Sequence, residues 1–368
     1  MRLINLVDRV DSVNFGIWNA AISTAGPLWA AHDIASELWY PANAAEVPVF
    51  AEPILARPVQ VGREAQCWKA ARGAALNPCE DVVVTHGCWQ YPTHWGAYLR
   101  AAGFRWVSVP HGMLEPWSMR QKRWRKRLFF SLVEGRLQRR ATVCRAVSRP
   151  EKESLRSRLG IPLVHIPNAV AAPDDLRPKS PGCPLVFLFL GRLHHKKGLR
   201  PLIEGWERSE IWKSGDSRLI IAGPDDGEEA PLRALLKRSA SAASVSLYGP
   251  AFGAEKAALF GAAHYFVLPS HSEGFPTSVL EAMRSGLVPI ISDGCNFPEA
   301  LQERIALRAG PCRESVATAL RASKRMPVEA YEDRSRRAKT LIARRYSISV
   351  VAEQLARLVR DVLSNPGR

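Results

Sequence analysis

Two carboxylates, Glu273 and Glu281, stand on either side of a Gly-Phe-Pro-Thr-Ser turn. An apolar run, Tyr265 to Pro269, precedes the turn, and a second run, Val288 to Ser292, follows a short helical stretch. Strand, glycine-bearing turn, helix and strand make a βαβ unit, and open parallel sheets bind their ligands at the carboxyl ends of the strands. Free N–H groups at the start of a helix also suit a phosphate. The pattern therefore predicts a nucleotide-like ligand between the two glutamates.

A purely structural interpretation is available for each of these residues alone. Ser278 and Glu281 have the S-x-x-E spacing of a capping box, in which Glu281 would only tie down the start of the helix. Gly286 would then be an ordinary helix stop, and Glu273 an ordinary acid in a loop. The choice between the two interpretations depends on the whole string and not on single residues.

The string from Leu268 to Asp293 resembles the E-x7-E signature of the retaining GT-B glycosyltransferases, the large family-4-type group. The resemblance implies that Glu273 meets the donor sugar and that Glu281 meets the ribose hydroxyls. It also implies that backbone N–H groups are offered to the sugar and diphosphate by the turn between them, which consists of Gly274, Phe275, Pro276 and Thr277.

A basic motif, GRLHHKKG, follows the apolar run Leu185 to Leu190 and ends at Gly198. Cations at a strand end beside a helix start form a natural diphosphate cradle, although a solvated basic loop is an equally simple explanation. The string resembles the G-R-x-x-x-x-K-G element of the same family, which implies that Arg192 and Lys197 neutralise the donor phosphates. Fixed cations there would stabilise the charge of the departing phosphate. The resemblance implies no cofactor and no metal, and the sequence contains no D-x-D motif.

Two histidines in the first half follow short strand-like runs. His111, in VPHGMLEPW, occupies the H-G position that many members of this family use near the reacting sugar, where a neutral imidazole would orient a sugar hydroxyl. A lone histidine in a loop is otherwise a satisfied structural residue. His86, in VVVTHGCWQYP, is a second candidate, and the two strings together resemble the subset acting in bacterial surface-polysaccharide assembly. Gly16 stands where the family has a Gly-Gly loop that is absent here, so its contact with the donor stays open.

Composition bounds the class of protein. The 368 residues are 46% hydrophobic, enough for two domains with substantial cores. No apolar run reaches the ~18 residues that a membrane span needs, and the N-terminus lacks the features of a signal peptide. The seven cysteines form no C-x-x-C pair, which indicates reduced thiols in a cytosolic protein. The net charge of +16 favours anionic partners.

Strand and helix patterns alternate along the chain, as in parallel α/β sheets. The predicted strands are Arg2–Val7, Asp81–Thr85, Trp106–Val109, Leu185–Leu190, Arg218–Ala222, Val245–Leu247, Tyr265–Leu268 and Val288–Ser292. The predicted helices are Gly26–Trp39, Tyr91–Ala102 and Ile348–Leu363. The resemblance implies a GT-B fold, with two Rossmann-like domains facing across a cleft. We expect an acceptor-side domain over residues 1–171, a linker over 172–184, a donor domain over 185–345 and a helix over 346–368 that crosses back to the first domain.

A basic and aromatic segment follows His111. Six of the eight residues from Arg120 to Arg127 are basic, Trp124 lies among them, and apolar residues follow at helical intervals as far as Leu137. A basic amphipathic helix is typical of a membrane-surface element, although its apolar face could pack in the core and its composition would also suit nucleic acid. We favour an anionic membrane surface, because a polysaccharide glycosyltransferase needs an acceptor that is carried on a lipid diphosphate.

The resemblance implies a retaining hexosyltransferase, and the basic segment favours a place at the inner face of the membrane. It would move a sugar from a nucleoside diphosphate sugar to a hydroxyl of a lipid-linked glycan in surface polysaccharide biosynthesis. The alternatives are a nucleotide-sugar epimerase of the same fold and a basic membrane- or nucleic-acid-binding module with an inactive site. The base, the sugar, the acceptor, the linkage and the oligomeric state stay open.

Overall fold

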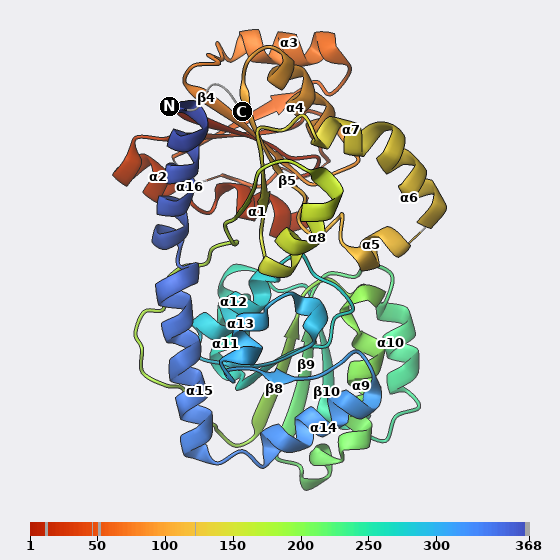
Figure 1. The fold of residues 1–368 in the computed structure, drawn as a ribbon. Coiled ribbons are helices and arrows are strands. Elements are labelled where there is room, and N and C mark those ends of the chain that lie inside the picture. Colours follow the sequence, from red (N-terminus) through yellow and green to blue (C-terminus); the bar gives the residue numbers. More distant parts are fainter. Residues whose placement is uncertain (12–13, 46, 51–52, 122, 365–368) are drawn as a thin grey trace. The chain divides into compact units, whose positions relative to one another are not determined.

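The computed structural model describes residues 1–11, 14–45, 47–50, 53–121 and 123–364. The chain divides into two compact units (Figure 1). The first contains Met1–Ala169 and the C-terminal segment from Ile348, and the second is Val170–Ser347. The first unit therefore ends two residues before the expected boundary at 171, and the expected linker, 172–184, is part of the second unit.

The first unit is built on a seven-stranded parallel sheet in the order β3-β2-β1-β4-β5-β6-β7. Its strands are β1 (Arg2–Leu6), β2 (Ala35–Pro41), β3 (Ile54–Val59), β4 (Asp81–His86), β5 (Arg105–Val109), β6 (Val143–Ala146) and β7 (Leu163–His165). The order reverses between β1 and β4, which is the point where doubly wound sheets open a crevice for ligands.

The second unit repeats this plan with six parallel strands in the order β10-β9-β8-β11-β12-β13. They are β8 (Leu185–Leu190), β9 (Ser217–Ala222), β10 (Val245–Gly249), β11 (Tyr265–Leu268), β12 (Val288–Ile291) and β13 (Leu307–Arg308). Here the order reverses between β8 and β11.

Helices connect the strands of both sheets. Those of the first unit are α1 (Phe15–Ile22), α2 (Ala25–His32), α3 (Glu64–Gly73), α4 (Tyr91–Ala101), α5 (Pro116–Arg120), α6 (Arg123–Phe129), α7 (Gly135–Gln138), α8 (Arg149–Leu159) and α16 (Ile348–Ser364). Those of the second are α9 (Leu199–Ser209), α10 (Glu229–Leu236), α11 (Gly253–Ala262), α12 (Thr277–Arg284), α13 (Pro298–Gln302), α14 (Arg313–Lys324) and α15 (Val328–Leu341). In Figure 1, α9 and α10 lie on one face of the second sheet, and α11 and α12 lie on the other.

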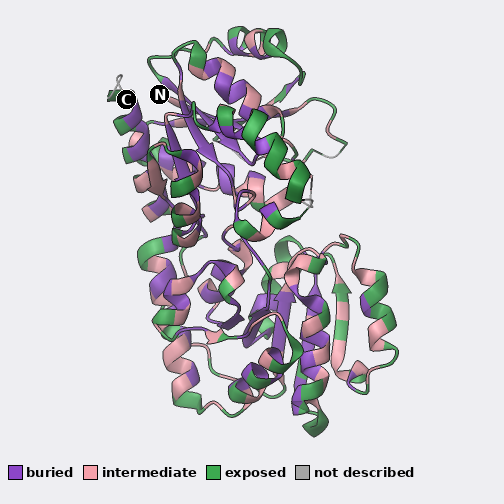
Figure 2. Ribbon diagram, turned by 45° about the vertical axis from the view of Figure 1, so that its right-hand side comes forward, coloured by how far each residue is buried: buried purple, intermediate pink, exposed green. Residues whose placement is uncertain are grey.

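Each core lies on both faces of its sheet, because helices cover both faces. Strands β4, β11 and β12 are buried along their length, and most other central strands are largely buried (Figure 2). In the first unit, Trp39 of β2 meets Trp95 of α4 edge to face, with 6.4 Å between the ring centroids. In the second, Phe187 of β8 stacks on Tyr265 of β11 at 5.0 Å. Large aromatic groups thus fix the central strands on which the candidate site depends.

The C-terminal helix is built as its sequence pattern predicts. Val351, Leu355, Leu358 and Val362 are all buried on one side of α16. The helix packs against α2 within the first unit. Residues 365–368, the end of the expected C-terminal segment, lie outside the described residues.

The predicted helix over Gly26–Trp39 is wrong in its second half. Helix α2 ends at His32, where Asp33 takes a left-handed conformation with φ 54°, and strand β2 begins at Ala35. Strand β2 lies between β1 and β3, so its residues are buried on both faces and lose the two-residue alternation that marks a strand. The sequence analysis also missed β3, β6, β7 and β13.

The residues expected to form a linker have no helix or strand, but they are bound closely to the second unit. The backbone N–H of Lys179 donates to the hydroxyl of Ser335 at 2.8 Å. Lys339 pairs with Asp175 at 3.0 Å. The segment therefore behaves as part of the second unit and not as a free connector.

Candidate functional site in the second unit

Two loops meet where the strand order of the second sheet reverses. The first runs from Gly191 to Gly198, directly after β8, and the second runs from Pro269 to Pro276, directly after β11. Strands β8 and β11 are parallel neighbours, with Phe187 opposite Tyr265, so both loops leave the same edge of the sheet. This is the ligand position of doubly wound folds.

The approach of the two loops depends on a glycine. Gly198 has φ 70°, and a Cβ atom added to it would stand 2.1 Å from the carbonyl oxygen of Pro269. The backbone N–H of His271 donates to the carbonyl of Lys196 at 2.8 Å, and the hydroxyl oxygen of Ser270 lies 3.0 Å from the same carbonyl oxygen. Only a residue without a side chain allows this contact, and the contact places Lys197 beside the second loop.

Lys197 and Glu273 form an ion pair at the junction of the loops. The Lys197 ammonium lies 2.9 Å from each carboxylate oxygen of Glu273, and the two side chains are only 13% and 8% exposed. Burial opposes ionisation of Glu273, but the charges of Lys197 and Lys196 and the hydrogen bonds from Lys197 and Ser270 outweigh it, so the pKa of Glu273 lies below its ordinary value. The site thus holds a fixed carboxylate beside a fixed cation.

Glu273 is also held through its backbone by a third loop, which follows β12. Its N–H donates to the carbonyl of Gly294 at 2.6 Å, and the side-chain amide of Asn296 donates to its carbonyl at 2.5 Å. The hydroxyl of Ser270 donates to its carboxylate at 2.6 Å. Neither Ser270 nor Asn296 was predicted as a site residue. The position of Ser270, three residues before Glu273, was a signal that could have identified it, whereas no local pattern marks Asn296.

Arg192 and Glu281 have partners of their own. Arg192 pairs with Asp226, which lies beyond β9, at 2.8 Å, and its side chain is 37% exposed. Glu281 pairs with Lys256 of α11 at 2.6 Å, and its side chain is 23% exposed. Within the described residues, neither side chain forms a hydrogen bond or ion pair with Lys197 or Glu273. Asp226 and Lys256 were not predicted, because no local pattern marks them.

The turn between the two glutamates packs one side chain into the core and leads into a helix whose start has no side-chain cap. Phe275 is buried against Phe297 and Tyr346, with ring centroids 5.0 and 5.5 Å apart, while Pro276 precedes the first helical residue, Thr277. The capping box is wrong: Ser278 is already inside α12, and no side chain caps the start of this helix. Gly286 does end the helix, with φ 79°. Glu281 is therefore not needed for capping, which leaves its carboxylate for another role.

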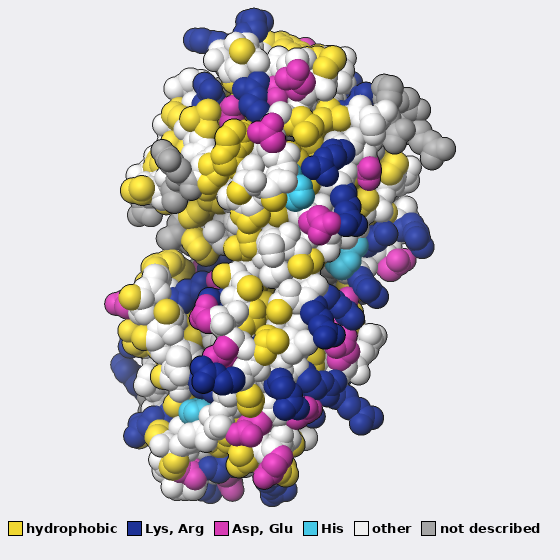
Figure 3. Space-filling model, turned by 90° about the vertical axis from the view of Figure 1, so that its left-hand side faces the viewer, with side chains coloured by type: hydrophobic (Ala, Val, Ile, Leu, Met, Phe, Trp, Pro, Cys, Tyr) yellow, Lys and Arg dark blue, Asp and Glu magenta, His cyan; other side chains and the backbone are white. Residues whose placement is uncertain are grey.

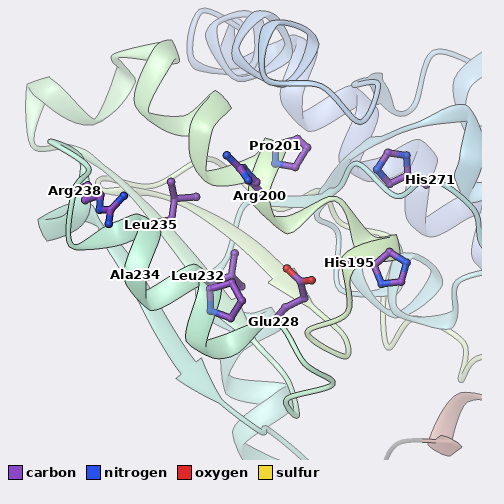
Figure 4. Close-up of a pocket in the computed structure, with 10 residues that line it drawn as sticks. His195, Arg200, Pro201, Glu228, Leu232, Ala234, Leu235, Arg238 and His271 are labelled. Atoms are coloured by element: carbon purple, nitrogen blue, oxygen red, sulfur yellow. The ribbon is translucent and has the colours of Figure 1, made fainter.

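A hollow of about 570 Å³ lies beside these loops (Figure 4). His195 and His271 stand at one end, and residues of α9 and α10, such as Arg200 and Leu232, line the rest. The predicted site residues are not among those that line it. The hollow borders the site on the α9 and α10 face of the sheet.

His111 and His86 belong to the first unit, where they form one chain of hydrogen bonds. The ring nitrogens His86 Nδ1 and His111 Nε2 are 2.9 Å apart, and His86 Nε2 is 3.1 Å from Asn5 Oδ1. Burial, with the charge of Arg145, lowers the pKa of His111 to about 3. Burial also lowers the pKa of His86, and His111 and Arg145 add to this effect. The lowered pKa values favour the neutral form of both imidazoles.

Gly16 lies in the first turn of α1 and is exposed. Residues 12 and 13, which precede it in the expected glycine loop, lie outside the described residues. The contact of this loop with a donor therefore stays a prediction.

The basic segment forms a helix that contributes nothing to the core. In α6 no residue is buried. Trp124, Leu128 and Phe129 are 72%, 55% and 39% exposed. Leu132, in the π-helical turn that follows, is 51% exposed. The apolar face is thus only partly core: Phe130 belongs to a core cluster and Leu137 packs against another. Lys122, part of the basic run, lies outside the described residues.

The described residues contain no helix that is both long and apolar enough to cross a membrane. All seven cysteines lie in the described parts of the chain, and none of them forms a disulfide.

Comparisons with known proteins agree with this fold. The family of glycosyl transferases group 1 matches residues 175–340, and the family of glycosyl transferase 4-like domains matches residues 24–169. Among solved structures, the sucrose-phosphate synthase of Thermosynechococcus elongatus superposes with a TM-score of 0.78 over 99% of both chains, at 17% identity. The two family matches cover the two units separately.

Curated relatives match over shorter stretches. A GDP-mannose:cellobiosyl-diphosphopolyprenol alpha-mannosyltransferase of Komagataeibacter xylinus is 31% identical over 181 residues, 48% of this chain and 45% of that protein. A putative colanic acid biosynthesis glycosyltransferase of Salmonella typhimurium is 25% identical over 222 residues, 58% of this chain and 52% of that protein. The chain thus spans about half the length of these relatives. With both family matches and the doubly wound sheets, the chain belongs to the family-4-like, group 1 glycosyltransferases of GT-B fold.

Proposed function

We propose that this protein transfers a hexose from a nucleoside diphosphate sugar to a hydroxyl of a polyprenyl-diphosphate-linked glycan, with retention of the anomeric configuration. The Lys197–Glu273 pair at the strand reversal carries the proposal, because it sets a cation beside a buried carboxylate where such sheets bind nucleotides. The relatives named for a diphosphopolyprenol acceptor and for colanic acid biosynthesis support a role in surface polysaccharide assembly.

Each charged residue has a distinct part in this proposal. Lys197 and the partly exposed Arg192 bind the diphosphate and stabilise the charge that grows on it as the sugar leaves. Glu273 accepts hydrogen bonds from sugar hydroxyls, and Glu281 accepts them from the ribose. His111 orients a hydroxyl of the sugar. These cations take the place that a metal ion fills in other transferases, so we propose that no metal or other cofactor takes part.

Retention is proposed to follow a front-face reaction. The bond between the anomeric carbon and the phosphate oxygen breaks, and a bond between that carbon and the acceptor oxygen forms on the same face. The proton of the acceptor hydroxyl passes to the departing phosphate, so no protein base is required. This scheme needs the charges near the phosphate to be fixed before the reaction, and the closed contact between the two loops provides that.

Thermal shift with GDP-mannose, UDP-glucose and ADP-glucose is the first test. A donor at 100 times its dissociation constant stabilises the native state by about 2.7 kcal/mol, which gives a visible shift. We expect one nucleotide class to respond in the wild type and in Lys213→Met, an exposed-lysine control, but not in Lys197→Met or Glu281→Gln. The responding donor is then incubated with a polyprenyl-diphosphate glycan, and the anomeric configuration of the product is read by NMR.

Two results would favour the alternatives. Conversion of the donor sugar to its epimer without any acceptor would indicate an epimerase. No response to any donor, together with firm binding to nucleic acid or vesicles, would indicate a binding module.

The same proposal places the protein at the inner, cytoplasmic face of the membrane. The exposed apolar side chains of α6 stand among basic residues, and each cation near an anionic leaflet contributes about 1 kcal/mol. On the face shown in Figure 3, by contrast, Lys and Arg side chains are scattered among Asp and Glu. In a flotation assay, we expect the protein to float with phosphatidylglycerol vesicles, and little of it to float with neutral vesicles. Preferential binding to duplex DNA, with a steep salt dependence, would contradict this.

A further inference from the structure

Three side chains from neighbouring strands form a single hydrogen-bonded line in the first unit. Asn5 of β1 lies opposite Val84 of β4, and His86 is two residues further along β4 on the same face. His86 in turn lies opposite Val109 of β5, and His111 is two residues beyond Val109. Because alternate side chains of a strand share a face, the register brings Asn5 and His86 together at the reversal point of the sheet. His111 lies in the turn that follows β5, and its ring joins the line through His86.

The orientation of the Asn5 amide is set by its surroundings. Its nitrogen lies 3.4 Å from the carbonyl oxygen of Leu3 and 3.3 Å from that of Glu37. Carbonyl oxygens only accept hydrogen bonds, so the donating nitrogen must face them. The oxygen of Asn5, which only accepts, therefore faces His86 Nε2 at 3.1 Å.

This orientation determines the tautomer of both histidines. His86 Nε2 must carry the proton that it donates to Asn5, so in a neutral ring His86 Nδ1 has no proton and accepts. His111 Nε2, 2.9 Å away, must then carry a proton and donate it to His86 Nδ1. The Nδ1 atom of His111 is left as an acceptor.

The surroundings keep both rings neutral, which the line of hydrogen bonds requires. Arg145 is 3% exposed, and its guanidinium donates to the carbonyls of Ile166 and Pro167 at 2.9 and 2.8 Å. A buried cation beside the two rings disfavours a second positive charge. Glu151 is the nearby acid, and its carboxylate accepts from the N–H groups of Gly112 and Val147.

The backbone at His111 is held in an uncommon conformation that aims the ring back along this line. His111 has φ 53° and Gly112 has φ 76°, and the N–H of Met113 donates to the carbonyl of Pro110 at 3.1 Å. Positive φ at both central residues defines a tight turn of the mirror-image type. A non-glycine residue with positive φ is strained, and the surrounding contacts hold it in this conformation. Such strain is typical of functional sites.

The geometry points to Asn5 and His86 as positioning residues that present His111 Nδ1 as a fixed acceptor for a hydroxyl group. His111 is only partly buried, and within the described residues its one hydrogen bond is to His86. This inference rests on the proposed function, in which His111 meets a sugar hydroxyl. The ring can accept a hydrogen bond from that hydroxyl, and it has no proton on Nδ1 to donate. His111 is thus excluded as a general acid in this arrangement.

The tautomers are measured directly by two-bond ¹H–¹⁵N NMR of the histidine rings in the free protein, with assignment by His86→Gln and His111→Asn. We expect both histidines to carry their proton on Nε2 and to keep it there between pH 5 and pH 8. A proton on His111 Nδ1 in the wild type would overturn the inference. This readout does not depend on any donor or acceptor, so it stands even where the proposed transferase activity fails.

Two variants of His86 separate positioning from folding. Glutamine can donate to Asn5 and accept from His111, so His86→Gln keeps the direction of the line, whereas His86→Leu removes it. We expect His86→Leu to move part of the His111 population to the Nδ1–H tautomer and to lower kcat/KM roughly tenfold, the value of one neutral hydrogen bond. His86→Gln is expected to restore most of that loss.

The control is His94→Leu on α4, a histidine outside the line, with an unchanged His111 spectrum expected. An unchanged His111 spectrum and unchanged kcat/KM in His86→Leu would overturn the inference. If His86→Leu does not fold, the wild-type and His86→Gln spectra still decide the tautomer.

Discussion

At the scale of the residue, the site depends on charges that neutralise one another before any ligand arrives. The side chains of Lys197 and Glu273 are only 13% and 8% exposed, whereas those of Lys256 and Glu281 are more open, at 19% and 23%. A buried ion pair costs much of its Coulomb energy in desolvation, so such a pair is weak evidence for stability. Its position at the strand reversal favours a role in binding the donor.

Lys197→Met tests this pair, because it leaves the Glu273 carboxylate buried without its partner. We expect the free energy of unfolding to fall by about 3 kcal/mol and donor turnover to fall by roughly a hundredfold or more. Urea unfolding and nucleoside diphosphate release measure the two effects. The double variant Lys197→Met/Glu273→Gln should recover stability and stay inactive. Recovery of activity in it would contradict a catalytic role.

Chelation tests whether the cations of the chain suffice. Because Arg192 and Lys197 supply positive charge at the diphosphate in our proposal, we expect excess EDTA to leave the rate of nucleoside diphosphate release unchanged. The control is the same assay with added Mg²⁺ after chelation. A rate that falls with EDTA and returns with Mg²⁺ would show that the reaction needs a metal.

At the scale of the element, two strand-ending loops become one site through a backbone contact. Gly198→Ala would place a methyl group against the Pro269 carbonyl at 2.1 Å, and it would also strain a backbone with φ 70°. Gly215 has φ 75° with open space around it, so Gly215→Ala carries the backbone strain alone. In urea unfolding, we expect Gly215→Ala to lower the free energy of unfolding by about 1 kcal/mol and Gly198→Ala to lower it clearly more. Donor turnover is expected to be lost only in Gly198→Ala. Equal losses at the two glycines would contradict the contact.

Helix α6 is the second element with a function of its own. Trp124 is 72% exposed on α6, and Trp29 is 51% exposed on α2. We expect Trp124→Ser to weaken binding to phosphatidylglycerol vesicles roughly tenfold, because an interfacial tryptophan contributes on the order of 1.4 kcal/mol or more. Trp29→Ser, the matched control, is expected to bind as the wild type does. A similar loss in both variants would remove α6 from the membrane contact.

At the scale of the whole molecule, buried titratable groups set how stability varies with pH. Burial lowers the pKa of His111 to about 3 and those of His165 and His264 to about 4, and it lowers that of His86 as well. The unfolded chain therefore binds protons between these values and pH 6.5 that the native protein does not, so their contribution to stability falls as pH falls. Burial raises the pKa of Glu151 to about 7, and its contribution has the opposite sign.

The pKa values of His194 and His271 are also lowered, first of all by burial. These six histidines of the described residues outweigh the one raised glutamate, so we expect the free energy of unfolding to decrease from pH 6.5 to pH 4.5. Urea titrations at pH 7.5, 6.5, 5.5 and 4.5 measure the trend. His165→Gln is expected to make the decrease shallower, since one of the groups that takes up protons only on unfolding is gone. Stability that rises on acidification would contradict this balance.

Local pattern was sufficient for much of the fold and for the position of the main motifs. The strands Leu185–Leu190 and Tyr265–Leu268 have the predicted bounds, because their apolar runs are compact and end at glycine or proline. The family was also apparent from the spacing of Glu273, Glu281, Arg192 and Lys197, and the family matches confirm it. Strand β2 was misread because a strand buried on both faces loses its alternation.

The sequence alone determined which residue types stand at the ends of the strands, because turns and their glycines depend on the local sequence. Only the tertiary structure decided their partners: Lys197 with Glu273, Arg192 with Asp226, Glu281 with Lys256, and Asn5 with His86 and His111. These partners are far apart in the chain, and strand order and register bring them together. Register is set by the burial of whole sheet faces, which no single motif can report.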